Sequence, residues 1–75
     1  MSSANRFGTG QQVQWHWGNG IATGKIADRF ERDVTRTLQG TQVTRHGSEE
    51  NPAYLIRQED GDEVLKLGSE LEQQR

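Results

Sequence analysis

The amino-acid sequence predicts a small all-β domain, and two observations lead to that fold class. Apolar and polar residues alternate in several short runs, with the period of two that a half-buried strand requires. The runs are separated by short segments that contain glycine, such as Gly18-Asn19-Gly20 and Asp60-Gly61, where the chain can reverse. Helical periodicity is not found over any useful length. We therefore expect short antiparallel strands joined by tight turns.

The first two strands are expected at residues 11–17 and 21–30. In the first run, Val13, Trp15 and Trp17 alternate with polar residues. The second run places its apolar residues on one face, namely Ala22, Gly24, Ile26 and Phe30. A glycine inside a strand often marks a bulge or a sharp bend, so Gly24 predicts the point at which the sheet curls.

A second pair of alternating runs, residues 34–38 and 41–45, surrounds Gln39-Gly40. Threonine, valine and arginine dominate this pair, so we expect a hairpin with few apolar anchors that extends into solvent. The last hairpin should join Tyr54-Leu55-Ile56 to residues 64–67 across Asp60-Gly61, in a two-residue type I′ turn. Ser69 is expected to cap one helical turn over residues 70–72.

Five or six such strands in 75 residues favour the small SH3-like barrel over the larger OB-like one. We expect a disordered N-terminus over residues 1–6, one barrel domain over residues 7–72 and a loose tail over residues 73–75. The sequence contains no cysteine, so the core alone must hold the fold, and a reducing, cytoplasmic location is expected. No apolar run has the length of a signal peptide or a membrane span, so no membrane association is expected.

Charge is unevenly distributed along a chain whose net charge is −2. Residues 24–46 carry five basic and three acidic side chains, whereas residues 49–75 carry three basic and eight acidic ones. The basic middle could contact phosphate and the acidic end could contact basic partners, although such asymmetry also serves solubility.

The aromatic residues are the first candidates for a binding site. In a barrel of this size Trp15, Phe30 and Tyr54 are most simply core residues. Trp17 ends its strand beside a flexible turn, so we expect its ring at the mouth of the barrel. Aromatic rings at a barrel end attract cations and stack on bases, and the candidate recognition residues there are Trp17, Asn19, Phe30 and Tyr54.

The arginines provide an alternative site for nucleic acid. Arginine binds phosphate well through its planar guanidinium group, and the candidate residues are Arg29, Arg32, Arg36 and Arg45. Acidic residues are interleaved with them, so cross-strand ion pairs explain these arginines at least as well.

Residue patterns for catalysis are weak. Gly24-Lys25 lacks the spacing of a phosphate-binding loop, and no helix follows it. Neither His16 nor His46 has a serine partner at motif spacing. Asp60 and Asp62 flank a turn glycine, where acids are ordinary turn formers, and the oxygen donors of a calcium loop are missing. We therefore expect no enzyme activity, no metal and no cofactor.

Two stretches resemble a known family. They are GQQVQWHWGNGIATGKI near the start and VTRHGSEENPAYLIRQEDGDEVLKLGSEL near the end. Their most specific pieces are Val13-x-Trp15 with a Gly24-Lys25-Ile26 strand after it, and Ser48-Glu49-x-Asn51-Pro52-x-Tyr54. The chain resembles the hypervirulence-associated Tudor domain of small bacterial and fungal proteins, from about residue 7 to residue 71. The resemblance implies a Tudor-type, SH3-like barrel. Tudor domains at large bind methylated lysine or arginine, or nucleic acid, but no settled activity or cofactor attaches to this family.

Three functions are compatible with these observations. We favour a non-catalytic, Tudor-like module that recognises an unidentified protein or peptide at the aromatic barrel end. Nucleic-acid binding along the arginine-rich strands is the second hypothesis and is less favoured. The third is an assembly domain in which the hairpin of residues 34–45 exposes an edge strand, which would make the protein a monomer or a weak homodimer.

Overall fold

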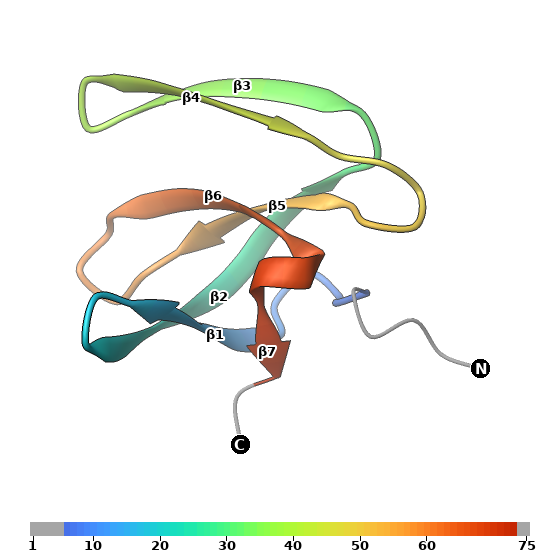
Figure 1. Ribbon diagram of the computed structural model, residues 1–75. Coiled ribbons are helices and arrows are strands. Elements are labelled where there is room, and N and C mark those ends of the chain that lie inside the picture. The colour runs from blue at the N-terminus through green and yellow to red at the C-terminus, as the bar shows by residue number, and fades with distance from the viewer. Residues whose placement is uncertain (1–5, 74–75) are drawn as a thin grey trace.

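The computed structural model describes residues 6–73, and it is built almost entirely from antiparallel strands (Figure 1). The elements are β1 (Gln12–Trp17), β2 (Gly20–Phe30), β3 (Asp33–Leu38), β4 (Thr41–His46), β5 (Ala53–Arg57), β6 (Glu63–Leu67), the 3-10 turn η1 (Gly68–Glu70) and β7 (Glu72–Gln73). One sheet has five strands in the order β6-β5-β2-β1-β7, and β3 and β4 form a second, two-stranded sheet. The structure thus confirms the all-β, SH3-like barrel with one short C-terminal helical turn.

Strand β5 lies at the centre of the molecule because both of its faces are covered. Tyr54 and Ile56 point into a core cluster that includes Val13, Trp15 and Ile26. Ala53 of β5 and Leu65 of β6 belong to a second cluster that also contains Phe30 and Val34, and Leu55 packs against it. The β3–β4 hairpin therefore acts as a cover for the other face of the β5–β6 ribbon, as Figure 1 shows.

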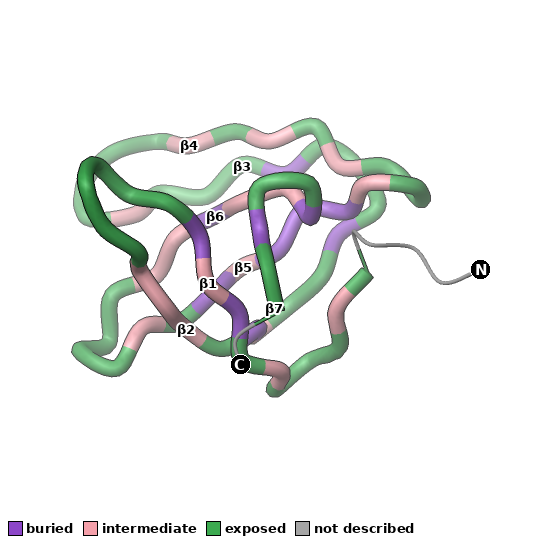
Figure 2. Tube along the Cα trace, turned by 60° about the horizontal axis from the view of Figure 1, so that its bottom comes forward, coloured by how far each residue is buried: buried purple, intermediate pink, exposed green. Residues whose placement is uncertain are grey.

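Burial follows this two-cluster arrangement. The buried segments lie in the middle of the molecule, while the hairpin turns are exposed (Figure 2). Trp15, Phe30 and Tyr54 are all buried, which confirms that these three aromatic side chains belong to the core. The β3–β4 hairpin contributes few anchors, since Val34 is its only buried residue and Leu38 and Val43 are half-buried.

The bend of β2 occurs at Ala27, so the predicted bulge at Gly24 is wrong. Ile26 pairs with Ile56 and Asp28 pairs with Leu55, which leaves Ala27 as the extra residue. This bulge shifts the alternation of β2 by one residue. As a result Ile26 faces the first cluster and Phe30 faces the second, instead of both sharing one face as the alternation predicts.

The turns of the first two hairpins are tight. Trp17 pairs with Gly20, so the β1–β2 turn has two residues, and Gly18 adopts a positive φ of 55°. In the β3–β4 turn, Gln39 and Gly40 both have positive φ, at 53° and 80°, which is the pattern of a type I′ turn.

The β5–β6 turn differs from the predicted two-residue type I′ turn. Gln58 N–H donates to Asp62 O at 2.8 Å and Gly61 N–H donates to Gln58 O at 2.9 Å, so the loop is longer. Gly61 has a positive φ of 92°, whereas Asp60 does not. The reason lies in Asp60, whose Oδ1 accepts the Asp62 N–H at 2.9 Å and so replaces a backbone turn with a side-chain one.

The C-terminal segment also differs from the prediction in detail. Ser69 lies inside η1 instead of capping it, and its N–H donates to Asn51 Oδ1 at 2.8 Å. Glu72 does not continue a helical turn, because it pairs with Gln14 in β7. Gln73, the first residue of the expected loose tail, pairs with Val13.

Part of the chain lies outside the described residues, namely residues 1–5 and 74–75. These positions hold most of the expected disordered N-terminus and loose tail. The described helical structure is limited to a single 3-10 turn, and within residues 6–73 no helix has the length and apolar character needed to cross a membrane.

Candidate functional site

Three hairpin turns meet at one end of the molecule, on the left in Figure 1. They connect β1 with β2, β3 with β4, and β5 with β6. A hollow of about 290 Å³ lies among these elements, which we call the three-turn hollow. Its wall includes Trp15 and Trp17 from β1, Gln39 from the β3–β4 turn and Asp60 and Asp62 from the β5–β6 turn.

Trp17 is the most exposed large apolar residue of the described chain, at 71%. It lies two residues beyond Trp15, so the two indoles share one face of β1. Trp15 is buried in the first cluster, whereas Trp17 pairs with Gly20, which has no side chain to cover its ring. The hollow therefore has one fixed and one accessible aromatic wall.

Two acidic residues, Asp60 and Asp62, line the same hollow as these rings. Asp60 is held in place because its Oδ1 accepts the Asp62 N–H. Asp62 directly precedes β6. Lys66, on β6, is the one basic residue in the wall of the hollow among the described residues. An aromatic face together with carboxylates attracts a cation, and the indole of tryptophan is the strongest aromatic partner for one.

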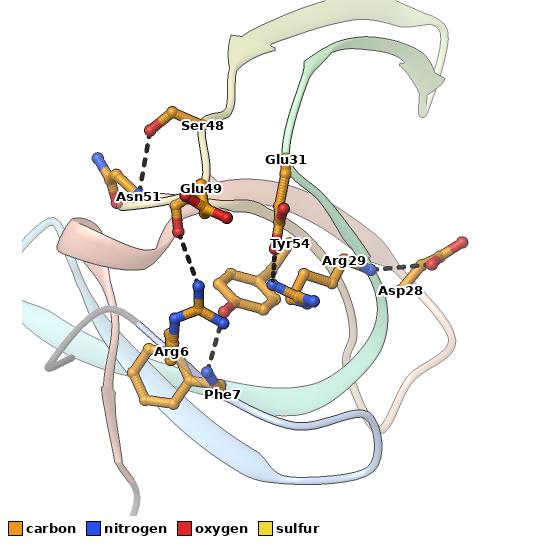
Figure 3. Close-up of polar contacts among 9 residues, drawn as sticks. All are labelled: Arg6, Phe7, Asp28, Arg29, Glu31, Ser48, Glu49, Asn51 and Tyr54. Carbon is orange, nitrogen blue, oxygen red and sulfur yellow. Dashed lines mark hydrogen bonds and ion pairs between the residues drawn. The ribbon is translucent and has the colours of Figure 1, made fainter. Parts of the chain in front are cut away.

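The four predicted aromatic-end residues do not form one surface. Tyr54 is fully buried, and its hydroxyl accepts the Phe7 N–H at 2.9 Å (Figure 3). The Phe7 ring packs edge-on against Tyr54, with the ring centroids 5.7 Å apart. Phe30 is buried at the far end of β2 from Trp17. Asn19 lies in the turn beside Trp17, so the structure brings these two together and separates them from Phe30 and Tyr54.

The predicted arginine strip is divided among several partners. Arg29 forms an ion pair with Glu31, which Figure 3 shows, and Arg45 Nε lies 3.6 Å from Glu70 Oε1. Arg32 and Arg36 both place their guanidinium groups over the Phe30 ring, at 5.2 and 5.0 Å from its centroid. Two of the four arginines are thus neutralised locally and two cover the second core cluster.

Sequence reasoning missed the role of the β5–β6 turn in this site. It treats Asp60 and Asp62 as turn formers, and the hydrogen bond between them confirms that role. Their place in the same hollow as Trp17 could still have been predicted from the sequence. In a chain of successive antiparallel hairpins, the turns of the first, second and third hairpins can fall at the same end of the domain, as they do here.

Residues with catalytic or metal-binding chemistry are dispersed. His46 Nδ1 lies 3.2 Å from Asp33 Oδ1 on an exposed strand end, and His16 is exposed on β1. Within residues 6–73, no group of three histidine or acidic side chains is placed to hold a metal ion.

The family model of the TUDOR domain of hypervirulence associated proteins matches residues 10–71. The chain belongs to this family. Comparison with curated proteins and with solved structures found no match. Membership agrees with the SH3-like barrel and makes this chain a small Tudor-type binding module.

The Ser48-to-Tyr54 motif of this Tudor domain has a structural role. Ser48 Oγ accepts the Asn51 N–H at 3.1 Å, which Figure 3 shows, and the Asn51 side chain exchanges two hydrogen bonds with Ser69. Pro52 O accepts the Gly68 N–H at 2.8 Å. The motif therefore ties the entry of β5 to η1, at the opposite end of β5 from the β5–β6 turn.

Proposed function

We propose that this Tudor domain binds a cationic side chain of a protein or peptide partner in the three-turn hollow. The observation that supports this proposal most directly is that the exposed Trp17 lines a hollow also lined by Asp60 and Asp62. A cation in the hollow would contact an indole face and two carboxylates at once. The recognition surface is therefore narrower than the predicted barrel end, because Phe30 and Tyr54 belong to the core.

The ligand favoured by this geometry is a methylated ammonium group. Quaternary and methylated ammonium groups are weakly hydrated, so they lose little hydration free energy when they move from water to an aromatic wall. A single exposed cation–π contact contributes about 0.5–1 kcal/mol, and more when it is desolvated. We therefore expect weak binding to an isolated side chain, with further affinity from neighbouring residues of the partner.

The proposal predicts that trimethyl-lysine peptides shift the Trp17 indole N–H signal in a saturable NMR titration. The Trp17→Ala variant should lose this binding, because it removes the accessible aromatic wall. Ile21→Ala is the matched control, since Ile21 is the other exposed large apolar residue within residues 6–73, at 55%, and lies outside the hollow. The Ile21→Ala variant should bind the trimethyl-lysine peptide with the same affinity as the parent protein.

Charge variants separate a cation site from a general apolar contact. Asp62→Asn removes one carboxylate with little change in shape, so it should weaken binding of the methylated peptide. A peptide with acetyl-lysine, which is neutral, should not compete. If the acetylated and methylated peptides bind equally well, or if no signal near Trp17 moves at millimolar peptide, the proposed cation site is wrong.

We propose no catalytic role for the domain. The family name denotes a Tudor domain, and the two histidines lie on exposed strand positions. Nucleic-acid binding through the arginines receives less support, since Arg29 and Arg45 face acidic partners and Arg32 and Arg36 cover Phe30.

A further inference from the structure

A larger hollow, of about 540 Å³, lies across β2, and we call it the β2 groove. Residues 23–27 of β2 line it, and Thr9 and Gly10 form one wall. Gly10 N–H donates to Ile26 O at 2.8 Å and Ile26 N–H donates to Gln11 O at 3.0 Å, so this wall is fixed to the strand. Gln58 and Glu59 of the β5–β6 turn form the opposite wall.

The β2 groove contains two cations in direct register. Lys25 on β2 pairs with Arg57 on β5, and both residues line the groove. Residues directly opposite each other on antiparallel strands have Cβ atoms roughly 4.5–5.5 Å apart, and like charges at such positions are destabilising. A sheet that carries such a pair is stabilised when an anion lies between the two charges.

The neighbouring acids compensate only one of these cations. Arg57 Nη2 lies 3.2 Å from Glu63 Oε2, and this pair uses one of the guanidinium nitrogens. Within residues 6–73, no carboxylate lies within ion-pair distance of Lys25. The ammonium of Lys25 and the remaining Arg57 donors are therefore available to a ligand in the groove.

We propose that the β2 groove binds an oxyanion, either a carboxylate or a phosphate group of a small ligand, between Lys25 and Arg57. Charge-assisted hydrogen bonds from an ammonium and a guanidinium to such a group are roughly twice as strong as hydrogen bonds between neutral groups. Thr9 and Thr23 add neutral hydroxyl donors to the same lining. Glu59, at the edge of the groove, opposes the anion and limits its affinity.

This inference does not depend on the three-turn hollow, because Gln58 is the only residue that the two linings share. The test is an NMR titration with inorganic phosphate and, separately, with succinate, at constant ionic strength balanced by chloride. We expect saturable shifts at the amides of residues 23–27 and 57–59. Saturation by phosphate alone identifies a phosphate site, and saturation by succinate alone identifies a carboxylate site.

Matched variants decide whether Lys25 is the contact. Lys25→Gln should lower the affinity for the preferred anion about fivefold, which is the upper end of the contribution of one partly exposed ion pair. Arg29→Gln is the control, because it removes the same charge from the same strand outside the groove and should leave the affinity unchanged. Glu59→Gln should bind the anion more tightly.

A second measurement needs no ligand. In low-salt chloride buffer without phosphate or succinate, Lys25→Gln should raise the denaturation midpoint relative to the parent protein, because it removes the like-charge pair. The inference is overturned if neither anion gives saturable shifts in the groove, or if Lys25→Gln and Arg29→Gln weaken binding equally. Retention of anion binding by Trp17→Ala would show that the two sites are separate.

Discussion

Gly24 occupies a position where β2 approaches β5 too closely for any side chain. A Cβ at this residue would lie 2.6 Å from Ile56 Cγ2 and 2.9 Å from Arg57 O. Both neighbours belong to the central strand, and Ile56 is fully buried, so neither can move away easily. The glycine is thus required by packing and not by an unusual backbone angle.

Gly24→Ala should therefore lower the free energy of unfolding by about 1–3 kcal/mol, the usual cost of overpacking. Urea denaturation followed by tryptophan fluorescence would measure this loss. Gly8→Ala is the control, because a Cβ there meets no atom within 4 Å. A Gly24→Ala protein as stable as Gly8→Ala would contradict the close contact between β2 and β5.

At the same scale, Trp15 and Trp17 show how position along one strand divides two identical side chains between core and surface. Trp15 belongs to the first cluster and pairs with Ala22, which packs against that cluster. Trp17 pairs with Gly20, next to the β1–β2 turn. Two residues of strand, roughly 7 Å, are enough to carry the second indole beyond the core.

At the scale of elements, the β3–β4 turn carries a local conflict. Gln39 adopts a positive φ of 53°, a conformation that costs an ordinary L-residue about 1–2 kcal/mol. Asparagine tolerates this region better, and Asn-Gly is the preferred pair for a type I′ turn.

Gln39→Asn should therefore raise the stability of the domain by about 0.5 kcal/mol, a gain in the range of improved turn residues. Thermal denaturation would detect the change. Gln42→Asn, on an exposed position of β4, should give no such gain, because asparagine is depleted in strands. Equal effects of the two substitutions would show that the turn conformation is not the cause.

The β3–β4 sheet also leaves both of its outer edges without a strand partner among the described residues. Its outer side is polar, and Thr35 Oγ1 lies 2.8 Å from Thr44 Oγ1 across the two strands. Such edges are potential sites for pairing with another chain. Assembly through this hairpin, as a weak homodimer, stays a prediction.

At the scale of the whole molecule, the two core clusters share β5, so neither is expected to unfold alone. Val34→Ala removes two methyl groups from the second cluster and should lower the free energy of unfolding by about 1–2 kcal/mol. Since Trp15 lies in the first cluster, its fluorescence should report the same shift as the NMR amide signals of β3 and β4.

Thr37→Val is the control for this experiment, because residue 37 is exposed on the same strand and valine keeps the branched shape. Its effect should stay within about 0.5 kcal/mol. If Val34→Ala shifts the hairpin signals but leaves the Trp15 transition in place, the hairpin is a separate folding unit and the shared role of β5 is wrong.

The agreement between sequence and structure is closest where the determining interactions are local. Alternation in residues 12–17 and 41–46 and glycine at the turns place six strands within one or two residues of their true ends. The β5–β6 turn differs because of a local hydrogen bond to the Asp60 side chain, whereas two other misplaced features share a non-local cause. The bulge at Ala27 and the short strand β7 depend on partners more than twenty-five residues away in the chain, which no local pattern records.

The amino-acid sequence by itself determined the fold class and the order of the strands along the chain, because period, turn chemistry and strand length are properties of neighbouring residues. The exposure of Trp17 was decided by the structure. Only the tertiary structure decided what lies beside Trp17. Closing the barrel buried Phe30 and Tyr54 and placed Asp60 and Asp62 in the lining of the hollow that contains Trp17. Which hairpin turns lie together depends on how the strands pair in the sheets, and that pairing involves residues that are distant in the chain.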